Sequence, residues 1–271
     1  MRPSARLVVL GKKLWTPAQI STALWLDAAD ASTITLNGST VSQWNDKSGN
    51  GRNATQATAA AQPTYNSTGL NSRPTLSFDG TTDTMTFPGS NVSGYALKFG
   101  TDSFAVHAVV SPTAVNGNYQ FFGARGFDVG WMVGFNSPST PGIRMYNSEE
   151  RWVPYPMNSI TATAEAQIFA ATAPRGQSGQ YFKDGNLLQT TTSVVGSQTM
   201  DNTVLVRLGS YTDNTGNALG FFPGGISEII LTSGVLSTTV RQFIEGYLAW
   251  KWGLVANLLL NHPFKFNPPL A

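Results

Sequence analysis

The sequence has no cysteine and few charged residues. Only 12% of its 271 residues are Asp, Glu, Lys or Arg, against roughly 25% in a typical soluble domain. Without cysteine there are no disulfides and no thiolate metal sites, so stability must come from a buried core. The net charge of +2 comes from basic residues scattered along the chain. This distribution lacks the basic patch of a nucleic-acid-binding protein.

Long apolar runs are also missing. No stretch approaches the roughly 18 apolar residues of a membrane span. The N-terminal apolar run, residues 7–10, has four residues before Gly11, whereas a signal peptide needs roughly 7–15 followed by a small-residue cleavage site. We therefore expect no signal peptide and no membrane segment, and a protein made in a cytoplasm.

Polarity comes instead from Ser, Thr, Asn, Gln and Gly. This mixture suits strands with exposed Thr and Ser faces, and the 27 Gly and 15 Pro indicate frequent turns. Short apolar or alternating runs between turn residues are typical of an all-β sandwich. Strands are predicted at residues 75–78, 84–87, 103–110, 119–123, 129–135, 167–172, 203–209 and 226–231.

Two local motifs are sharper. Asp184-Gly185 separates residues 181–183 from residues 186–188, and such a dipeptide predicts a β-hairpin with a type I′ turn. Apolar residues at helical spacing predict an amphipathic helix over residues 238–252, which Ser237 or Thr238 caps and Gly253 ends, before a Pro-rich tail. Thr16-Pro17 predicts a short helix reaching about Ser21.

Several segments resemble a known family. LWLDAAD (24–30), VSQWNDKSGNGRNA (41–54) and PTLSFDG (74–80) are similar to the start of concanavalin A-like, laminin-G-like jelly-roll modules of phage virion proteins and bacterial surface proteins. GISEII (225–230) and IEGYLAWKWGL (244–254) resemble the last core strand and C-terminal helix of such modules. The resemblance implies two stacked antiparallel sheets, closed on one side by the helix. Trp25, Trp44, Trp250 and Trp252 lie in these motifs and are interpreted as packing residues.

The chain divides into two parts in this interpretation. Residues 1–22 form an N-terminal arm and short helix, and residues 23–271 form the jelly-roll domain with its helix and tail. The arm combines basic residues with an apolar strip, which favours a docking role. Its docking residues are Arg2, Arg6, Leu7, Val8, Val9, Leu10, Lys12, Lys13 and Trp15.

Catalytic carboxylates are not evident. Glycosidases of this architecture need two carboxylates held within several ångströms, and none of the five glutamates has an acidic partner at strand spacing. Glu149 and Glu150 are adjacent, so on a strand they would face opposite sides. The sequence therefore indicates a protein that is not an enzyme, with glycoside hydrolysis as the least favoured function.

Metal and histidine sites remain open. Asp27 with Asp30, or Asp79 with Asp83, could contribute to a calcium site of the kind that laminin-G-like modules often hold, but turn-setting hydrogen bonds explain both pairs equally simply. We favour the second interpretation and predict no cofactor.

His107 points to the sheet face opposite Phe104, which is either a sugar-binding concave face or an ordinary sheet environment. His262 has no evident partner.

One stretch has the composition of a sugar-binding surface. Sugars stack on aromatic rings while amides and Arg bond their hydroxyls, and Trp131, Arg144, Tyr146, Asn147 and Trp152, together with Arg151 and Tyr155, offer that mixture. The alternative is that Trp131 lies in the core and the others form an ordinary loop.

The leading functional hypothesis is a non-enzymatic phage virion structural protein. It would decorate a capsid or associate with a tail, bind the major capsid protein or a tail protein through its arm, and occur in multiple copies or as a homo-oligomer. The resemblance and the absent export signal favour this location. The alternative is a lectin-like module for host-surface or environmental glycans.

Overall fold

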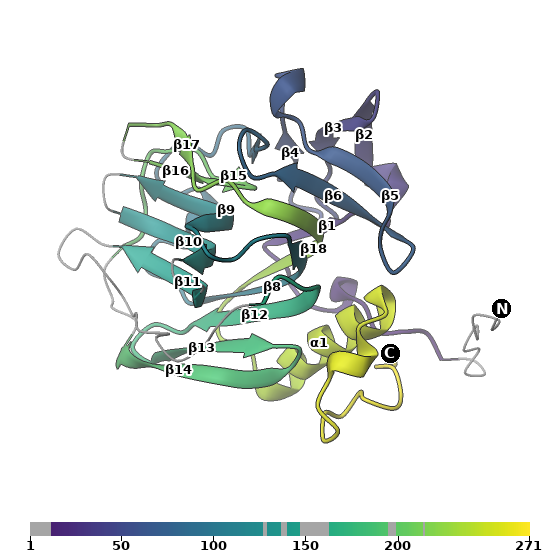
Figure 1. Cartoon of the computed structure of the whole chain (residues 1–271). Coiled ribbons are helices and arrows are strands. Elements are labelled where there is room, and N and C mark those ends of the chain that lie inside the picture. Colours follow the sequence, from purple (N-terminus) through teal and green to yellow (C-terminus); the bar gives the residue numbers. More distant parts are fainter. Residues whose placement is uncertain (1–11, 127–128, 137–139, 147–162, 195–198, 214) are drawn as a thin grey trace.

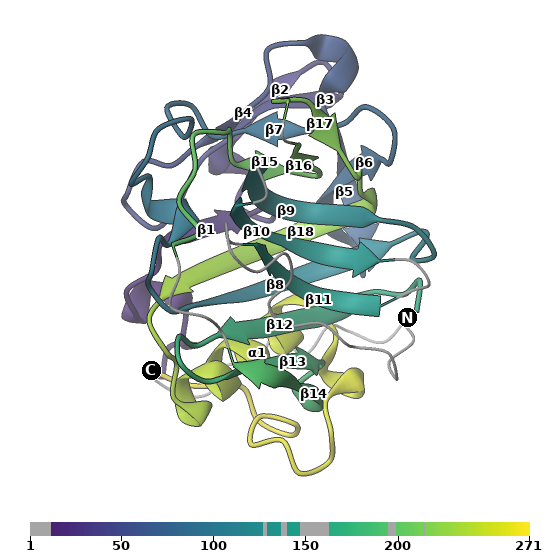
Figure 2. The ribbon, with the colours of Figure 1, turned by 90° about the vertical axis from the view of Figure 1, so that its left-hand side faces the viewer.

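The predicted all-β sandwich is confirmed. A computed structural model describes residues 12–126, 129–136, 140–146, 163–194, 199–213 and 215–271. Within these ranges, sixteen strands form one hydrogen-bonded sheet, in which fourteen follow a single path and two branch from it, and two more strands form a small separate sheet. The long path curls so that its two halves face each other as the layers of a sandwich (Figures 1 and 2).

The strands are short and separated by turns. In chain order they are β1 (Leu24–Asp27), β2 (Ile34–Asn37), β3 (Thr40–Trp44), β4 (Ala54–Thr55), β5 (Thr64–Leu70), β6 (Arg73–Asp79), β7 (Met85–Thr86), β8 (Phe104–Pro112), β9 (Tyr119–Gly126), β10 (Val129–Asn136), β11 (Thr140–Tyr146), β12 (Gln167–Ala173), β13 (Ser178–Lys183), β14 (Asn186–Val194), β15 (Arg207–Leu208), β16 (Tyr211–Thr212), β17 (Ala218–Leu219) and β18 (Pro223–Ser233).

Helical structure is sparse. Among the described residues it comprises α1 (Thr238–Trp252) and the single-turn 3₁₀ helices η1 (Pro17–Gln19), η2 (Ala31–Thr33), η3 (Ala59–Ala61), η4 (Ala96–Lys98) and η5 (Val255–Asn257). No helix in the described part of the chain is long and apolar enough to cross a membrane.

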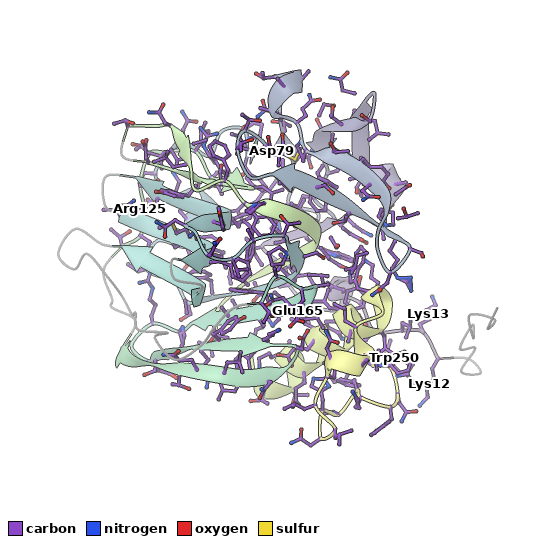
Figure 3. All side chains as sticks on the ribbon, in the orientation of Figure 1. Lys12, Lys13, Asp79, Arg125, Glu165 and Trp250 are labelled. Atoms are coloured by element: carbon purple, nitrogen blue, oxygen red, sulfur yellow. The ribbon has the colours of Figure 1, made fainter. Side chains whose placement is uncertain are left out.

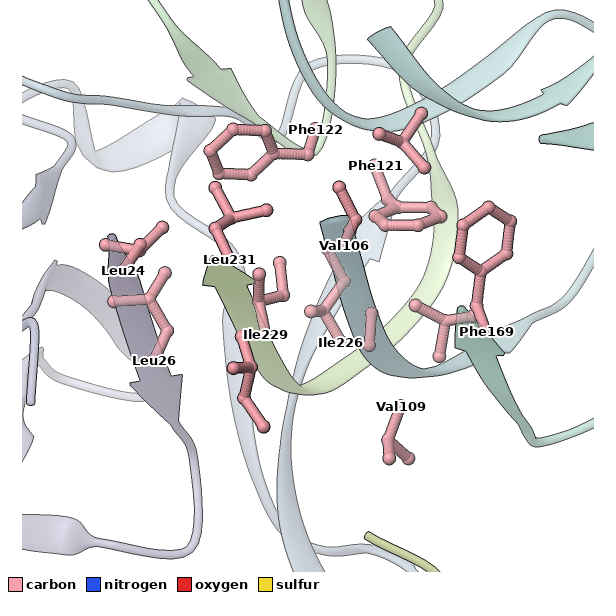
Figure 4. Close-up of a cluster of buried hydrophobic side chains, with 14 of the residues drawn as sticks. Leu24, Leu26, Val106, Val109, Phe121, Phe122, Phe169, Ile226, Ile229 and Leu231 are labelled. Carbon is pink, nitrogen blue, oxygen red and sulfur yellow. The ribbon is translucent and has the colours of Figure 1, made fainter. Parts of the chain in front are cut away.

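The core fills the space between the two layers. One layer orders β1, β18, β8, β12, β13 and β14, and the other contains β11, β10, β9 and β15. Phe121 of β9 meets Phe169 of β12 across the interior, with ring centroids 5.1 Å apart. Figure 4 shows these rings with buried aliphatic side chains of β1, β8 and β18. The layers are thus joined by the contiguous apolar packing that a chain without disulfides requires.

The predicted hairpin is confirmed. Asp184 and Gly185 have φ values of 53° and 78° and join β13 to β14. The predicted strand at residues 203–209 is much shorter, because only Arg207 and Leu208 pair with neighbouring strands. The preceding amides bond side chains instead: Val204 N donates to Asn202, and Val206 N donates to Ser90. Such local bonds replace a strand ladder.

The C-terminal helix has the predicted bounds and caps. The Ser237 hydroxyl accepts from Val240 N at 3.2 Å, and Gly253 ends α1 in the left-handed conformation with φ 71°. The helix packs across β8 and β12, on the outer side of that layer (Figure 1). At the other end of the chain, the Thr16-Pro17 helix is the single turn η1 and stops at Gln19.

His107 lies inside the molecule. Its side chain is fully buried in β8, and neither ring nitrogen has a hydrogen-bond partner among the described residues. Burial lowers the pKa of His107 to about 4, with nearby Glu245 opposing and Arg241 reinforcing that shift. The imidazole is therefore neutral near pH 7, and the hypothesis that it lines a sugar-binding face is wrong.

Candidate binding groove

A groove of about 570 Å³ opens where the first and last described segments meet the end of α1. We call it the terminal groove. Its apolar walls come from Leu14, Trp15, Tyr247, Trp250 and the tail residues Pro268, Pro269 and Leu270. Lys12, Arg73 and Lys251 contribute cationic side chains, and Thr16 and Ala29 complete the lining. Figure 3 labels Lys12 and Trp250 on this side of the molecule.

Residues 12–16 form one wall because they pair with the tail. Trp15 N donates to Pro269 O at 3.0 Å, and Ala271 N donates to Lys13 O at 2.8 Å. The Trp15 side chain, 8% exposed, packs against Phe243 and Tyr247 of α1. The assignment of Trp15 to a free docking arm is therefore wrong.

Lys12 and Lys13, in contrast, are exposed. The remaining docking candidates, Arg2, Arg6, Leu7, Val8, Val9 and Leu10, lie outside the described residues.

Two contacts hold the tail against the end of α1: the Phe264 ring packs on Gly246, and the Lys265 ammonium bonds carbonyls after the helix. A Cβ on Gly246 would come within 2.6 Å of the Phe264 ring, so glycine lets the tail lie against the helix. Lys265 Nζ donates to the carbonyls of Val255, Ala256 and Leu258. These contacts set the position of the Pro268–Pro269–Leu270 wall.

Trp250 supplies the groove with a half-buried aromatic side chain. Its indole Nε1 donates to Phe264 O at 2.8 Å, which orients the ring. Tyr247 neighbours both Trp250 and Lys251 on the helix surface, since residues three and four apart are neighbours on a helix. The other three motif tryptophans, Trp25, Trp44 and Trp252, are buried as predicted. The interpretation of Trp250 as a pure packing residue is incomplete, because this ring also lines the groove.

Behind the groove lies a buried carboxylate with four donors. Glu228 of β18 is fully buried and accepts from Trp25 Nε1 at 2.7 Å, Tyr247 Oη at 3.0 Å, Lys251 Nζ at 2.8 Å and Trp252 Nε1 at 2.6 Å. Burial raises the pKa of the Glu228 carboxyl, and the Lys251 ammonium opposes that shift. The carboxylate joins α1 to the sheet and thereby fixes Tyr247 and Lys251 in the wall of the groove.

Asp27 joins the same network from β1. It lies opposite Glu228 in the strand register, and its carboxylate binds Lys251 at 2.6 Å and Lys47 at 2.9 Å. This is a carboxylate pair that spacing along one strand does not reveal, because the partners lie on strands 200 positions apart in the chain. Cross-strand pairing of LWLD with GISEII is the only sequence signal for it.

Arg73 lines the groove because a tight turn attaches it to the end of α1. Asn71 and Ser72, with φ 49° and 62°, join β5 to β6. Asn71 Nδ2 donates to Trp252 O at 2.8 Å, and Arg73 Nε donates to Lys251 O. Both bonds satisfy carbonyls that a helix end leaves open.

The predicted sugar-binding stretch does not assemble into a described site. Trp131 is fully buried, stacks with Phe122 and donates from Nε1 to Leu97 O at 3.0 Å. Its proposed contact with sugar is therefore wrong, and the alternative placement of Trp131 in the core is confirmed. Arg144 and Tyr146 belong to β11. Asn147, Trp152 and the neighbouring Arg151 and Tyr155 lie outside the described residues.

The candidate metal pairs are held by other partners. The Asp79 carboxylate accepts from the Thr81 hydroxyl and from the backbone N–H of Thr81, Thr82 and Asp83, and against the opposing effect of burial these bonds hold its pKa below the usual range. Burial and the charge of Asp79 raise the pKa of Asp83 to about 6. Asp27 and Asp30 both bind Lys47. The turn-setting interpretation of Asp79 is confirmed, and the described residues contain no cluster of three metal-ligating side chains.

Comparisons with known proteins identify the architecture. No protein-family model matches the sequence, and neither does any curated protein. Among solved structures, domain 4 of the extracellular arabinanase AbnA of Geobacillus stearothermophilus, in complex with arabinotriose, is similar at 16% identity and TM-score 0.51, over 72% of this chain and 89% of that one.

Two further structures are similar. A GH54 α-L-arabinofuranosidase gives 13% identity and TM-score 0.54, over 86% of this chain and 60% of its own. The botulinum neurotoxin serotype D ligand-binding domain in complex with N-acetylneuraminic acid gives 13% identity and TM-score 0.51, over 83% of this chain and 50% of its own. At these identities the likeness concerns the fold alone, a β-sandwich.

Proposed function

We propose that the chain is a non-enzymatic carbohydrate-binding module whose ligand binds in the terminal groove. The observation that carries this proposal is the combination of the half-buried Trp250 ring with cationic donors around a groove of about 570 Å³. Sugars present apolar faces to aromatic rings and hydroxyls to such donors. The sugar complexes among the similar folds support the same assignment.

The carboxylate arrangement supports binding without hydrolysis. A glycosidase needs one carboxyl group that gives up a proton and a second that attacks or activates water. Glu228 is surrounded by two indoles, a phenol and an ammonium, and Asp27 is bound to two lysines. Neither group has an oxygen directed at the groove without a protein partner, so we assign this pair a structural role.

Trp250→Ala is expected to weaken glycan binding about tenfold or more while the chain stays folded. Truncating an aromatic anchor at a binding site removes contact area that the rest of the groove does not replace. The wild type and the variant are screened on a glycan array, and the affinity of the best ligand is measured by calorimetry.

Two controls accompany that measurement. Tyr119→Ala removes a half-buried ring of β9 that lines no part of the groove and should bind as the wild type does. Trp250→Phe keeps an aromatic face and loses the hydrogen bond to Phe264. Retained affinity in folded Trp250→Ala, or no ligand on the array, would refute the assignment of the groove to glycans.

A virion location is a second proposal, supported by the resemblance of residues 24–30, 41–54 and 244–254 to phage virion modules. In this proposal the module decorates a capsid or tail in several copies. Purified particles from the source should contain the chain in stoichiometric amount. Because Trp15 belongs to the core, the attachment test deletes residues 1–11 and not 1–15. Absence from particles would rule this location out.

A further inference from the structure

The charges around the terminal groove are all of one sign. Lys12, Arg73 and Lys251 line it, exposed Lys13 is adjacent to it, and no Asp or Glu of the described residues is part of the lining. Lys251 is neutralised, because its ammonium lies 2.6 Å from Asp27 and 2.8 Å from Glu228. The excess positive charge therefore comes from the lysines of residues 12–13 and from Arg73.

Arg73 has hydrogen-bonding capacity left over. A guanidinium carries five N–H donors in a planar fork, and within the described structure Arg73 uses only Nε, toward Lys251 O. That bond fixes the plane of the half-buried group at the groove and leaves both Nη atoms without a protein partner. Two parallel N–H donors of this kind match the two oxygens of a carboxylate.

The neighbouring acids do not compete for these donors. Asp27 and Asp30 are paired with Lys47, whose ammonium lies 2.9 Å and 2.8 Å from them. Glu228 is fully buried behind Tyr247 and Lys251. An anion that enters the groove therefore meets the two Nη atoms of Arg73 and the Lys12 ammonium, beside the Trp250 ring. The groove is partly desolvated, and charge pairing is stronger there than in bulk water.

We infer that the terminal groove selects sugars that carry a carboxylate. The Arg73 fork receives the carboxylate, Lys12 adds a second positive charge, and Trp250 contacts the apolar face of the same sugar ring. This inference rests on the proposed carbohydrate-binding function and adds the ligand class to it.

The test uses matched pairs of glycans that differ only in whether a uronic or sialic acid is present as the carboxylate or has been reduced to the alcohol. The full chain is screened on an array of such pairs, and the best pair is titrated by calorimetry at low and at physiological salt. We expect the carboxylated member to bind at least about tenfold more tightly, and this preference to shrink as salt rises.

Arg73→Gln should reduce the affinity for the carboxylated member about tenfold and that for the reduced member by a clearly smaller factor, because only the carboxylate uses both donors of the fork. The control is Lys183→Gln, which removes a cation on the β13–β14 hairpin, outside the groove, and should change neither affinity. Melting of each variant confirms that it is folded.

The outcomes separate the two proposals. Equal binding of both members of the pairs, or an unchanged preference in Arg73→Gln, overturns carboxylate selection and leaves a neutral-sugar module standing. If no member of any pair binds and the array is otherwise silent, the carbohydrate-binding function itself is overturned.

Discussion

Replacing Glu228 with leucine is expected to lower the free energy of unfolding by about 3–5 kcal/mol, which is the usual cost of removing one partner from a buried ionic network. The variant leaves the Tyr247 hydroxyl and two indole N–H groups without their acceptor, and leaves the Lys251 ammonium with Asp27 as its remaining carboxylate. The hydroxyl and the two indole N–H groups are buried, so no water would replace the lost acceptor. Equilibrium unfolding in urea, followed by tryptophan fluorescence, measures the loss.

The matched control is Glu165→Gln. Glu165 also pairs with a lysine, Lys183, but its side chain is 57% exposed, so its loss should cost less than about 1 kcal/mol. If Glu228→Leu were as stable as this control, the four hydrogen bonds would not be what joins α1 to the sheet. The position of the groove wall would then need another explanation.

Trp131→Ala should destabilise the chain by about 3–5 kcal/mol, the range for large aromatic truncations in a core. The Trp131 ring is fully buried, and its centroid lies 4.8 Å from that of Phe104 and 5.3 Å from that of Phe122. Truncation leaves a cavity between these rings and an unsatisfied carbonyl at Leu97. Calorimetric melting and urea unfolding both report the loss.

Trp131→Phe serves as the companion variant. It retains most of the ring volume and loses the hydrogen bond to Leu97, so its cost should be clearly smaller than that of the alanine variant. A folded Trp131→Ala chain of wild-type stability but reduced glycan binding would reverse our assignment and return Trp131 to a ligand surface.

Local patterns in the sequence were sufficient to predict the C-terminal helix and the β13–β14 hairpin. The helix over residues 238–252 could be predicted with its caps because Ser237, Gly253 and the apolar spacing all act within a few residues. The hairpin at Asp184-Gly185 was predictable for the same reason. The short extent of the strand within residues 203–209 was not predictable. The Val206 N–H donates to the hydroxyl of Ser90, more than a hundred positions away, and so does not bond a neighbouring strand.

The groove could not be predicted, because its parts come from five separate segments of the chain. Nothing in the sequence around Arg73, which precedes a proline, indicates a binding site. Only the turn at Asn71 and Ser72 attaches Arg73 to the end of α1. Trp250 looks like core, since it lies between buried Ala249 and half-buried Lys251 in an aromatic motif. Conversely, the aromatic and basic residues near Trp131 suggested a surface, because composition does not say which side of a strand faces the interior.

The pairing of Leu14 with Leu270 makes the chain nearly a closed ring. Residues 13 and 271 are hydrogen-bonded neighbours, so a covalent link between these two positions would need little change in the arrangement of the strands. A chain of this kind tolerates circular permutation, in which a short linker joins the two ends and a new opening is cut in an exposed turn such as that at Gly216.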